Sequence, residues 1–320
     1  MLPRGVIGGI EKKMRMFLWS GGLECFRKAK VSWKEVCKLR EEGGLGIPRL
    51  LDTCVAAGFR HIWQLITHHY SVWTRWVHSY RLKGVRVWDV VVPNDCAWYW
   101  RHLMGLRSAM YPYVLETESR AIWLGSPDGV FSTASAREVV REAGSVVDWA
   151  SVVWFRRHIP KHAFHVWIVV LDRAPLRDRL LRWGLDVDPL CILCRQGAED
   201  RDHLFFAYCV RRRIWRHVMR KVGGPFWISE WGDIVLWLRT RCGGNSLQSL
   251  VVKLGFGATL FHVWMERNRR TFGEAIMAEE DIVRAILFDV RFGIYNNKGY
   301  RATVRNRRIV DRMELEVNLF

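Results

Sequence analysis

Residues 191–209 read CILCRQGAEDRDHLFFAYC and carry four side chains of the types that bind zinc. Two intervening residues separate Cys191 from Cys194, so one turn can present both sulfurs to a single point. His203 follows after eight further residues and Cys209 after five more. Zn²⁺ prefers four N and S ligands in a tetrahedron, so the spacing predicts a structural zinc site without an open coordination position. The alternative is that the cysteines are ordinary buried thiols.

Helices are predicted on both sides of this motif. Apolar residues at helical spacing predict helices over residues 51–77 and 247–265. Proline at a first helical position predicts another over 160–171, and a glycine ends the one predicted over 176–183. A basic helix is expected from about residue 204 to 222.

One β-hairpin is predicted at a Pro-Asp-Gly turn. Residues 122–124 and 130–131 are β-prone and flank residues 126–129, which read SPDG. Ser132 is placed to cap a helix over 134–142. The fold class that the sequence predicts is therefore mainly α, with helical lobes, a small β-hairpin and a Cys3His zinc knuckle.

The composition points to a basic, folded protein. The 320 residues include 50 Lys and Arg against 32 Asp and Glu, which gives a net charge of +18, and 50% of the residues are hydrophobic. No uncharged apolar run approaches the roughly 18 residues of a membrane-spanning helix. The eight scattered cysteines argue against a secreted disulfide scaffold. We therefore expect an intracellular protein, nuclear or cytoplasmic, whose partner is a polyanion such as nucleic acid.

Several short blocks around the cysteines occur together in one known family. They read IPKHAF at 159–164, RAPLRDRL at 173–180, DHLFF at 202–206 and IW at 214–215. In this order they resemble the zinc-binding domain that follows the polymerase in plant LINE-type (non-LTR) retrotransposon reverse transcriptases. The resemblance implies a structural Zn²⁺ and a role beside RNA or DNA, with a reverse transcriptase core as a further partner.

The resemblance extends over nearly the whole chain. FLWSG at 17–21 and GGLGI at 43–47 resemble the end of the polymerase thumb, and HVWMERNRR at 262–270 resembles the segment that ends such polyproteins. This implies a helical remnant over 1–112, the zinc-binding domain over 113–222 and a C-terminal helical block with a basic tail over 223–320.

The spacing of the last cysteine departs from the family. Cys209 lies six positions after His203, one more than the family usually has, and Tyr208 stands where the cysteine is expected. One extra residue in an α-helix rotates a side chain by about 100°. The ligand set is therefore either adjusted by the turn or weakened to three.

Catalytic motifs are missing from the sequence. A reverse transcriptase holds two metal ions with clustered carboxylates, and no Asp-Asp pair occurs in this chain. There is no glycine-rich phosphate loop followed by Lys-Ser/Thr and no Gly-x-Ser-x-Gly elbow. The expectation is a non-enzymatic, C-terminal part of a polyprotein that begins downstream of the polymerase active site.

Basic residues concentrate around the predicted zinc site. Residues 151–222 contain 15 Lys and Arg against 7 Asp and Glu. Guanidinium groups bind phosphate without reading base sequence, whether in RNA or DNA. At helical spacing, Arg212, Arg216 and Arg220 share one face with Arg213 beside them. The other candidate contacts are Lys161, Arg173, Arg177 and Arg182. The alternative for this cluster is a solvated helix face.

Two other functions and one other residue group remain open. The chain is otherwise a structural or protein-interaction remnant that docks on a polymerase core, or a hydrolase whose carboxylates converge from distant segments. His158, His162 and His165 form a second histidine group without an acid or cysteine nearby in sequence. For these histidines, packing or a basic helix edge is the preferred interpretation.

Overall fold

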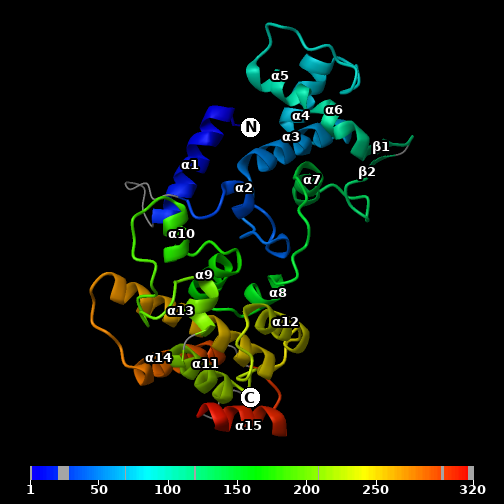
Figure 1. Ribbon diagram of the computed structural model, residues 1–320. Coiled ribbons are helices and arrows are strands. Elements are labelled where there is room, and N and C mark those ends of the chain that lie inside the picture. The colour runs from blue at the N-terminus through cyan, green and yellow to red at the C-terminus, as the bar shows by residue number, and fades with distance from the viewer. Residues whose placement is uncertain are drawn as a thin grey trace. The chain divides into compact units, whose positions relative to one another are not determined.

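The computed structural model describes residues 2–20, 29–68, 70–118, 120–207, 209–296 and 299–315, without the side chains of 207 and 209–211 (Figure 1). The chain forms two compact units, Met1–Leu39 with Gly44–Ser145 and Arg40–Gly43 with Val146–Phe320. Both are mainly helical, and the described strands form one small antiparallel sheet, as the sequence predicts. None of the described helices combines the length and apolar character that a membrane crossing requires.

The first unit is built around α3. Its elements are α1 (Arg4–Ser20), α2 (Trp33–Val36), α3 (Leu50–Ile66), α4 (Val72–Val77), the π-helix η2 (His78–Leu82), α5 (Trp98–Gly105), α6 (Arg107–Met110), the 3₁₀-helix η3 (Tyr111–Tyr113), β1 (Val114–Glu116), β2 (Ala121–Trp123) and α7 (Thr133–Val140).

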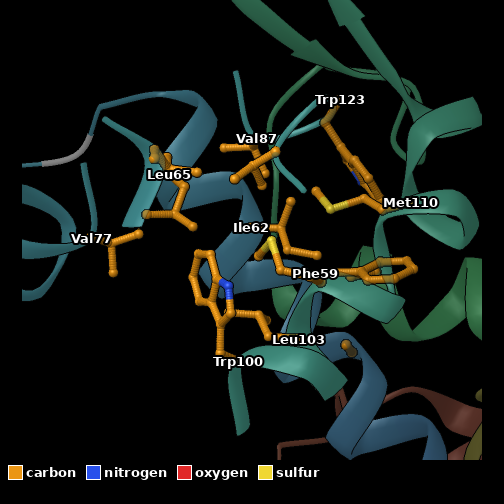
Figure 2. Packing of buried hydrophobic residues seen from close by; sticks show 14 residues of the cluster. Phe59, Ile62, Leu65, Val77, Val87, Trp100, Leu103, Met110 and Trp123 are labelled. Atoms are coloured by element: carbon orange, nitrogen blue, oxygen red, sulfur yellow. The ribbon is translucent and has the colours of Figure 1, made fainter. Parts of the chain in front are cut away.

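The core of the first unit forms along one face of α3. Phe59, Ile62 and Leu65 recur at helical spacing and are almost completely buried. Figure 2 shows these side chains pointing into a common cluster with Leu103 and Trp123, which come from α5 and β2. Burial of these apolar side chains is what holds the short elements of this unit together.

The helix predicted over 51–77 is interrupted in the structure. α3 ends at Ile66, and α4 starts at Val72 after a new N-cap. The Ser71 hydroxyl accepts a hydrogen bond from the Thr74 N–H at 3.0 Å, which caps the start of the second helix. The prediction of one continuous helix was therefore wrong, because apolar spacing does not register a cap inside the run.

The β-hairpin is present, but with a different partner strand. β1 pairs antiparallel with β2, with Val114 opposite Trp123. The Pro-Asp-Gly turn comes after β2, and the predicted second strand does not form. There the Asp128 side chain accepts the Val130 N–H at 3.1 Å, so this donor is not available for a strand ladder. The cap is confirmed: the Ser132 hydroxyl accepts the N–H of Ser135 at the start of α7.

The second unit consists of the short 3₁₀-helix at residues 40–42 and the described helices that follow residue 146. Its elements are η1 (Arg40–Glu42), α8 (Ala150–Val153), α9 (Pro160–Val170), α10 (Arg177–Arg182), the π-helix η4 (His203–Ala207), α11 (Cys209–Val222), α12 (Trp231–Arg241), α13 (Leu247–Thr271), α14 (Glu279–Tyr295) and α15 (Val304–Met313).

α13 is the central helix of the second unit. It packs against α9, α11 and α14, and 17 of its 25 residues are buried (Figure 1). Small residues allow this close packing. A Cβ atom on Gly255 would lie 3.1 Å from Val222, and one on Gly293 would lie 2.9 Å from Leu254. Segments from both sides of residue 222 therefore share one core, and the expected basic tail contributes a further packed helix, α15.

Candidate metal centre

A tight loop carries the first two predicted zinc ligands. The Cys191 N–H donates to the Gly197 carbonyl at 2.7 Å, and the Arg195 N–H donates to the Cys191 carbonyl at 2.7 Å. Arg195 has a left-handed backbone with φ of 58°. An isolated β-bridge between Leu190 and Ala198 closes the two ends of the loop. The backbone therefore doubles back around the cysteine pair.

His203 reaches this loop from the first turn of the following helical segment. The Asp200 carboxylate accepts the His203 N–H at 2.7 Å, as an N-cap does. The imidazole Nε2 lies 3.1 Å from Sγ of Cys194. A Cβ atom on Gly197 would lie 2.8 Å from Cε1 of His203, so the absence of a side chain at 197 leaves room for the ring.

Three of the four predicted ligands meet at one point. The ligand atoms of Cys191, Cys194 and His203 all lie within 4.8 Å of one another, and Cys191 is completely buried. With metal–ligand bonds of about 2.0–2.3 Å, one ion can contact two sulfurs and a nitrogen so arranged. This donor set suits Zn²⁺. Cys209, the fourth predicted ligand, begins α11, but its side chain lies outside the described residues.

A π-helical turn lies between His203 and Cys209. η4 spans His203–Ala207, and α11 follows from Cys209. A π-turn inserts one residue relative to an α-helix. The interval from His203 to Cys209 thus contains a turn that is wider than an α-helical turn.

Arg177 and Asp188 stabilise the segment that leads into the cysteine loop. Arg177 Nη1 donates to the carbonyls of Asp188 and Leu190 at 2.8 and 2.6 Å. The hydrogen bond from the Leu190 N–H, with the charges of Arg177 and Arg195, holds the pKa of the Asp188 carboxyl below its usual value. Arg177 was predicted as a nucleic-acid contact. The structure places its guanidinium in the support of the loop, with the side chain 11% exposed.

The end of α13 supports the loop from the other side. Glu266 is 2% exposed and accepts from Arg270 Nε at 2.8 Å, while Arg270 Nη1 donates to the Leu193 carbonyl at 3.3 Å. Arg267 pairs with Glu199, four residues before His203. The structural roles of Glu199, Glu266, Arg267 and Arg270 were not predicted from the residue spacing. The one sequence feature that could have indicated them is the charged run ERNRR at 266–270, which directly follows the apolar stretch predicted as a helix over 247–265.

The predicted basic face of α11 is partly exposed and partly paired. Arg212, Arg216 and Arg220 are exposed, and Arg220 lies over the Phe226 ring at 5.0 Å. Arg213 makes a two-pronged ion pair with Glu279 at 3.0 and 2.5 Å. An open cavity of about 580 Å³ is lined by Arg213, Arg216, His217, Arg220 and Lys221.

The remaining predicted nucleic-acid contacts are dispersed over the second unit. Arg173 is exposed, and Arg182 pairs with Asp178 within α10. Lys161, on α9, lies 3.2 Å from the carboxylate of Asp289 on α14.

Part of the chain is similar to a known family of zinc-binding domains. Residues 131–215, which include the cysteine loop and His203, match the family described as zinc-binding in reverse transcriptase. A putative ribonuclease H protein of Arabidopsis thaliana is 20% identical over 357 aligned residues, covering 86% of this chain. The chain spans 57% of that relative's length. No solved structure matches significantly. The similarity to a reverse-transcriptase zinc-binding domain is therefore confirmed.

Proposed function

We propose that this chain is a non-catalytic, zinc-stabilised, nucleic-acid-binding module from the C-terminal part of a LINE-type retroelement reverse transcriptase. One observation carries the proposal. Cys191, Cys194 and His203 converge within 4.8 Å inside the range that matches a zinc-binding family of reverse transcriptases. The order of the flanking sequence blocks supports the LINE-type origin.

Zinc has a structural role in this proposal. Cys209 supplies the fourth ligand, which closes a tetrahedral shell and leaves no position for a reactive water. The π-turn of η4 supports this assignment, because it compensates for the extra residue before Cys209. The ion then joins the cysteine loop to the start of α11.

The basic surface for nucleic acid is the face of α11 with Arg212, Arg216 and Arg220. These side chains are exposed and line or flank an open cavity. Guanidinium groups on one helix face suit phosphate oxygens spaced along a backbone. Binding of this kind is independent of base sequence and depends strongly on salt.

The absence of catalysis is also part of the proposal. Nucleotidyl transfer and phosphodiester hydrolysis at two metal ions need several carboxylates at one site. No Asp-Asp pair occurs in the sequence, which supports this part of the proposal. The name of the Arabidopsis thaliana relative refers to ribonuclease H, an activity that the proposed module lacks.

Metal analysis combined with binding measurements tests the proposal. Cys191→Ser and Cys209→Ser should each remove one zinc ion per chain, whereas Cys96→Ser, outside the motif, should remove none. The wild type should bind single-stranded RNA or duplex DNA in fluorescence anisotropy at low salt, and added salt should weaken binding steeply. Unchanged zinc in Cys191→Ser contradicts the metal assignment. No binding at low salt contradicts the nucleic-acid role and leaves docking on a polymerase core as the function to pursue.

A further inference from the structure

A second group of metal-ligating side chains lies away from the cysteine loop. It consists of His162 on α9, His262 on α13 and Asp289 on α14, whose potential ligand atoms all lie within 4.8 Å of one another. Nε2 of His262 is 2.9 Å from Oδ2 of Asp289, and Nε2 of His162 is 3.0 Å from the same oxygen. α13 packs against both α9 and α14 (Figure 1). These three helices therefore bring two imidazoles and one carboxylate to one point.

His162 is the member of this group that needs a partner most. It is 3% exposed, and neither of its ring nitrogens has a hydrogen bond among the described residues. Nε2 lies 3.0 Å from Oδ2 of Asp289, the same oxygen that His262 and Lys161 approach. A buried nitrogen without a partner is costly, whereas a metal ion beside the carboxylate oxygen would satisfy it.

The protonation states of the group suit a metal ion. Burial lowers the pKa of His162 to about 4, and burial also lowers the pKa of His262. Burial acts to raise the pKa of Asp289, but the hydrogen bonds from His262 and Lys161, together with the Lys161 charge, hold this pKa below its usual value. At neutral pH the group offers two neutral imidazoles and one carboxylate, which is the state that binds metal.

Lys161 gives the group a route to solvent. Its ammonium lies 3.2 Å from Oδ2 of Asp289, and its side chain is 53% exposed, while the Asp289 side chain is 13% exposed. The flexible lysine can swing outward when a cation takes its place at the carboxylate. The centroid of the Phe261 ring lies 4.8 Å from that of His162 and 5.1 Å from the Lys161 ammonium.

We infer that His162, His262 and Asp289 form a second metal site of this chain, for a divalent transition-metal ion such as Zn²⁺. Two imidazoles and one carboxylate are a donor set that such ions accept, with the remaining positions filled by water. The bound ion replaces the Lys161 ammonium at Asp289 and links α9, α13 and α14. This site shares no ligand with the cysteine loop, so it stands independently of the proposed zinc module.

Cobalt substitution tests this inference on the full chain. A cysteine-ligated Co²⁺ gives intense thiolate charge-transfer absorption, whereas a site of nitrogen and oxygen ligands gives only weak visible bands. In a Cys191→Ser, Cys194→Ser background, the chain should still bind one Co²⁺ at micromolar concentration, without the thiolate bands. Asp289→Asn in this background should weaken Co²⁺ binding by more than about 100-fold, since loss of a supporting outer-shell group alone costs about 10–100-fold.

Matched variants make the result decisive. Asp281→Asn, on the same helix but paired with Arg284 and 46% exposed, should leave Co²⁺ binding unchanged. His262→Gln should reproduce the loss seen for Asp289→Asn, with circular dichroism confirming that both variants stay folded. Equal Co²⁺ affinity in Asp289→Asn and its parent overturns the inference. If the wild-type chain shows no thiolate bands with Co²⁺, the proposed cysteine site is contradicted, but the histidine site is not. The two proposals can therefore be tested separately.

Discussion

Arg267 and Glu199 form a buried ion pair between α13 and the cysteine loop. Nε and Nη2 of Arg267 both donate to Oε1 of Glu199, at 3.0 and 2.7 Å, and the two side chains are 5% and 0% exposed. The same oxygen also accepts the Arg177 N–H at 3.2 Å. Arg267, which follows Glu199 by 68 residues, thus fixes the segment between Cys194 and His203.

Removing one partner of this pair should destabilise the second unit. Arg267→Met leaves the Glu199 carboxylate buried without its counter-ion, which should cost about 3–5 kcal/mol in unfolding free energy. Arg267→Lys keeps the charge but loses the planar fork, so we expect an intermediate loss. Urea unfolding followed by tryptophan fluorescence measures both. As a control, Arg284→Ala breaks an exposed pair and should cost less than about 1 kcal/mol. A similar small cost for Arg267→Met would contradict a structural role of the pair.

The potential zinc ligands that lie close together in the chain were predictable from the sequence. The distant residues that hold the cysteine loop in place were not. Cys191, Cys194 and His203 lie within 13 residues, and their chemistry alone indicates that they converge. Arg267 meets Glu199 across 68 residues, and His162 meets Asp289 through the packing of three helices. Such contacts depend on tertiary arrangement, which residue spacing does not encode.

The fold shows the same division between local and distant information. Ser132 was identified as a cap because capping involves neighbours three residues apart. The partner of β2 was misassigned because the SPDG turn resembles a hairpin turn, while Asp128 and Ser126 use it to bind the backbone locally. Arg177 illustrates the same limit for charge, since a guanidinium in a basic segment gives no sign that it holds backbone carbonyls.

Removal of metal should loosen the cysteine loop while the core of the first unit stays intact. In the proposed zinc site the ion links the loop to the helical segment from His203, so a chelator should remove a contact that holds residues 190–206 together. Hydrogen–deuterium exchange with peptide resolution should show faster exchange over 190–206 and no change over 50–66, in the separate core of the first unit. Equal protection of 190–206 with and without chelator would show that the loop is held by protein contacts alone.

The charge on α11 should set the salt dependence of nucleic-acid binding. Replacing Arg212, Arg216 and Arg220 by alanine removes the three proposed phosphate contacts, so the slope of log affinity against log salt should fall by about 3. Arg284→Ala removes one positive charge on α14, and the slope should stay as in the wild type. Anisotropy titrations at several salt concentrations give both slopes. If the triple variant keeps the wild-type slope, the contact surface lies elsewhere.

Ser135 should be more important than Ser132 for the first unit. Ser132→Ala removes the N-cap of α7 and should cost about 1 kcal/mol. Ser135→Ala removes the other half of the capping box and also leaves the Trp123 indole N–H, bonded at 3.0 Å to the Ser135 hydroxyl, without its acceptor. Trp123 is completely buried, so this second loss should add about 1–3 kcal/mol. Equal costs for the two variants in urea unfolding would show that the indole bond contributes nothing.

Cys242 should resist alkylation until the pH is strongly alkaline. Burial raises the pKa of the Cys242 thiol to about 11, and the nearby Lys253 only partly opposes this shift. The thiolate is the reactive form, so at pH 8 the native reactive fraction should be about 100-fold below that of a thiol with the ordinary value of 9.0. The rate of iodoacetamide labelling, measured by peptide mass spectrometry, should therefore rise about tenfold per pH unit between 8 and 10. Urea-unfolded protein is the reference, and the same rate in native and unfolded chains at pH 8 would contradict the burial of this thiol.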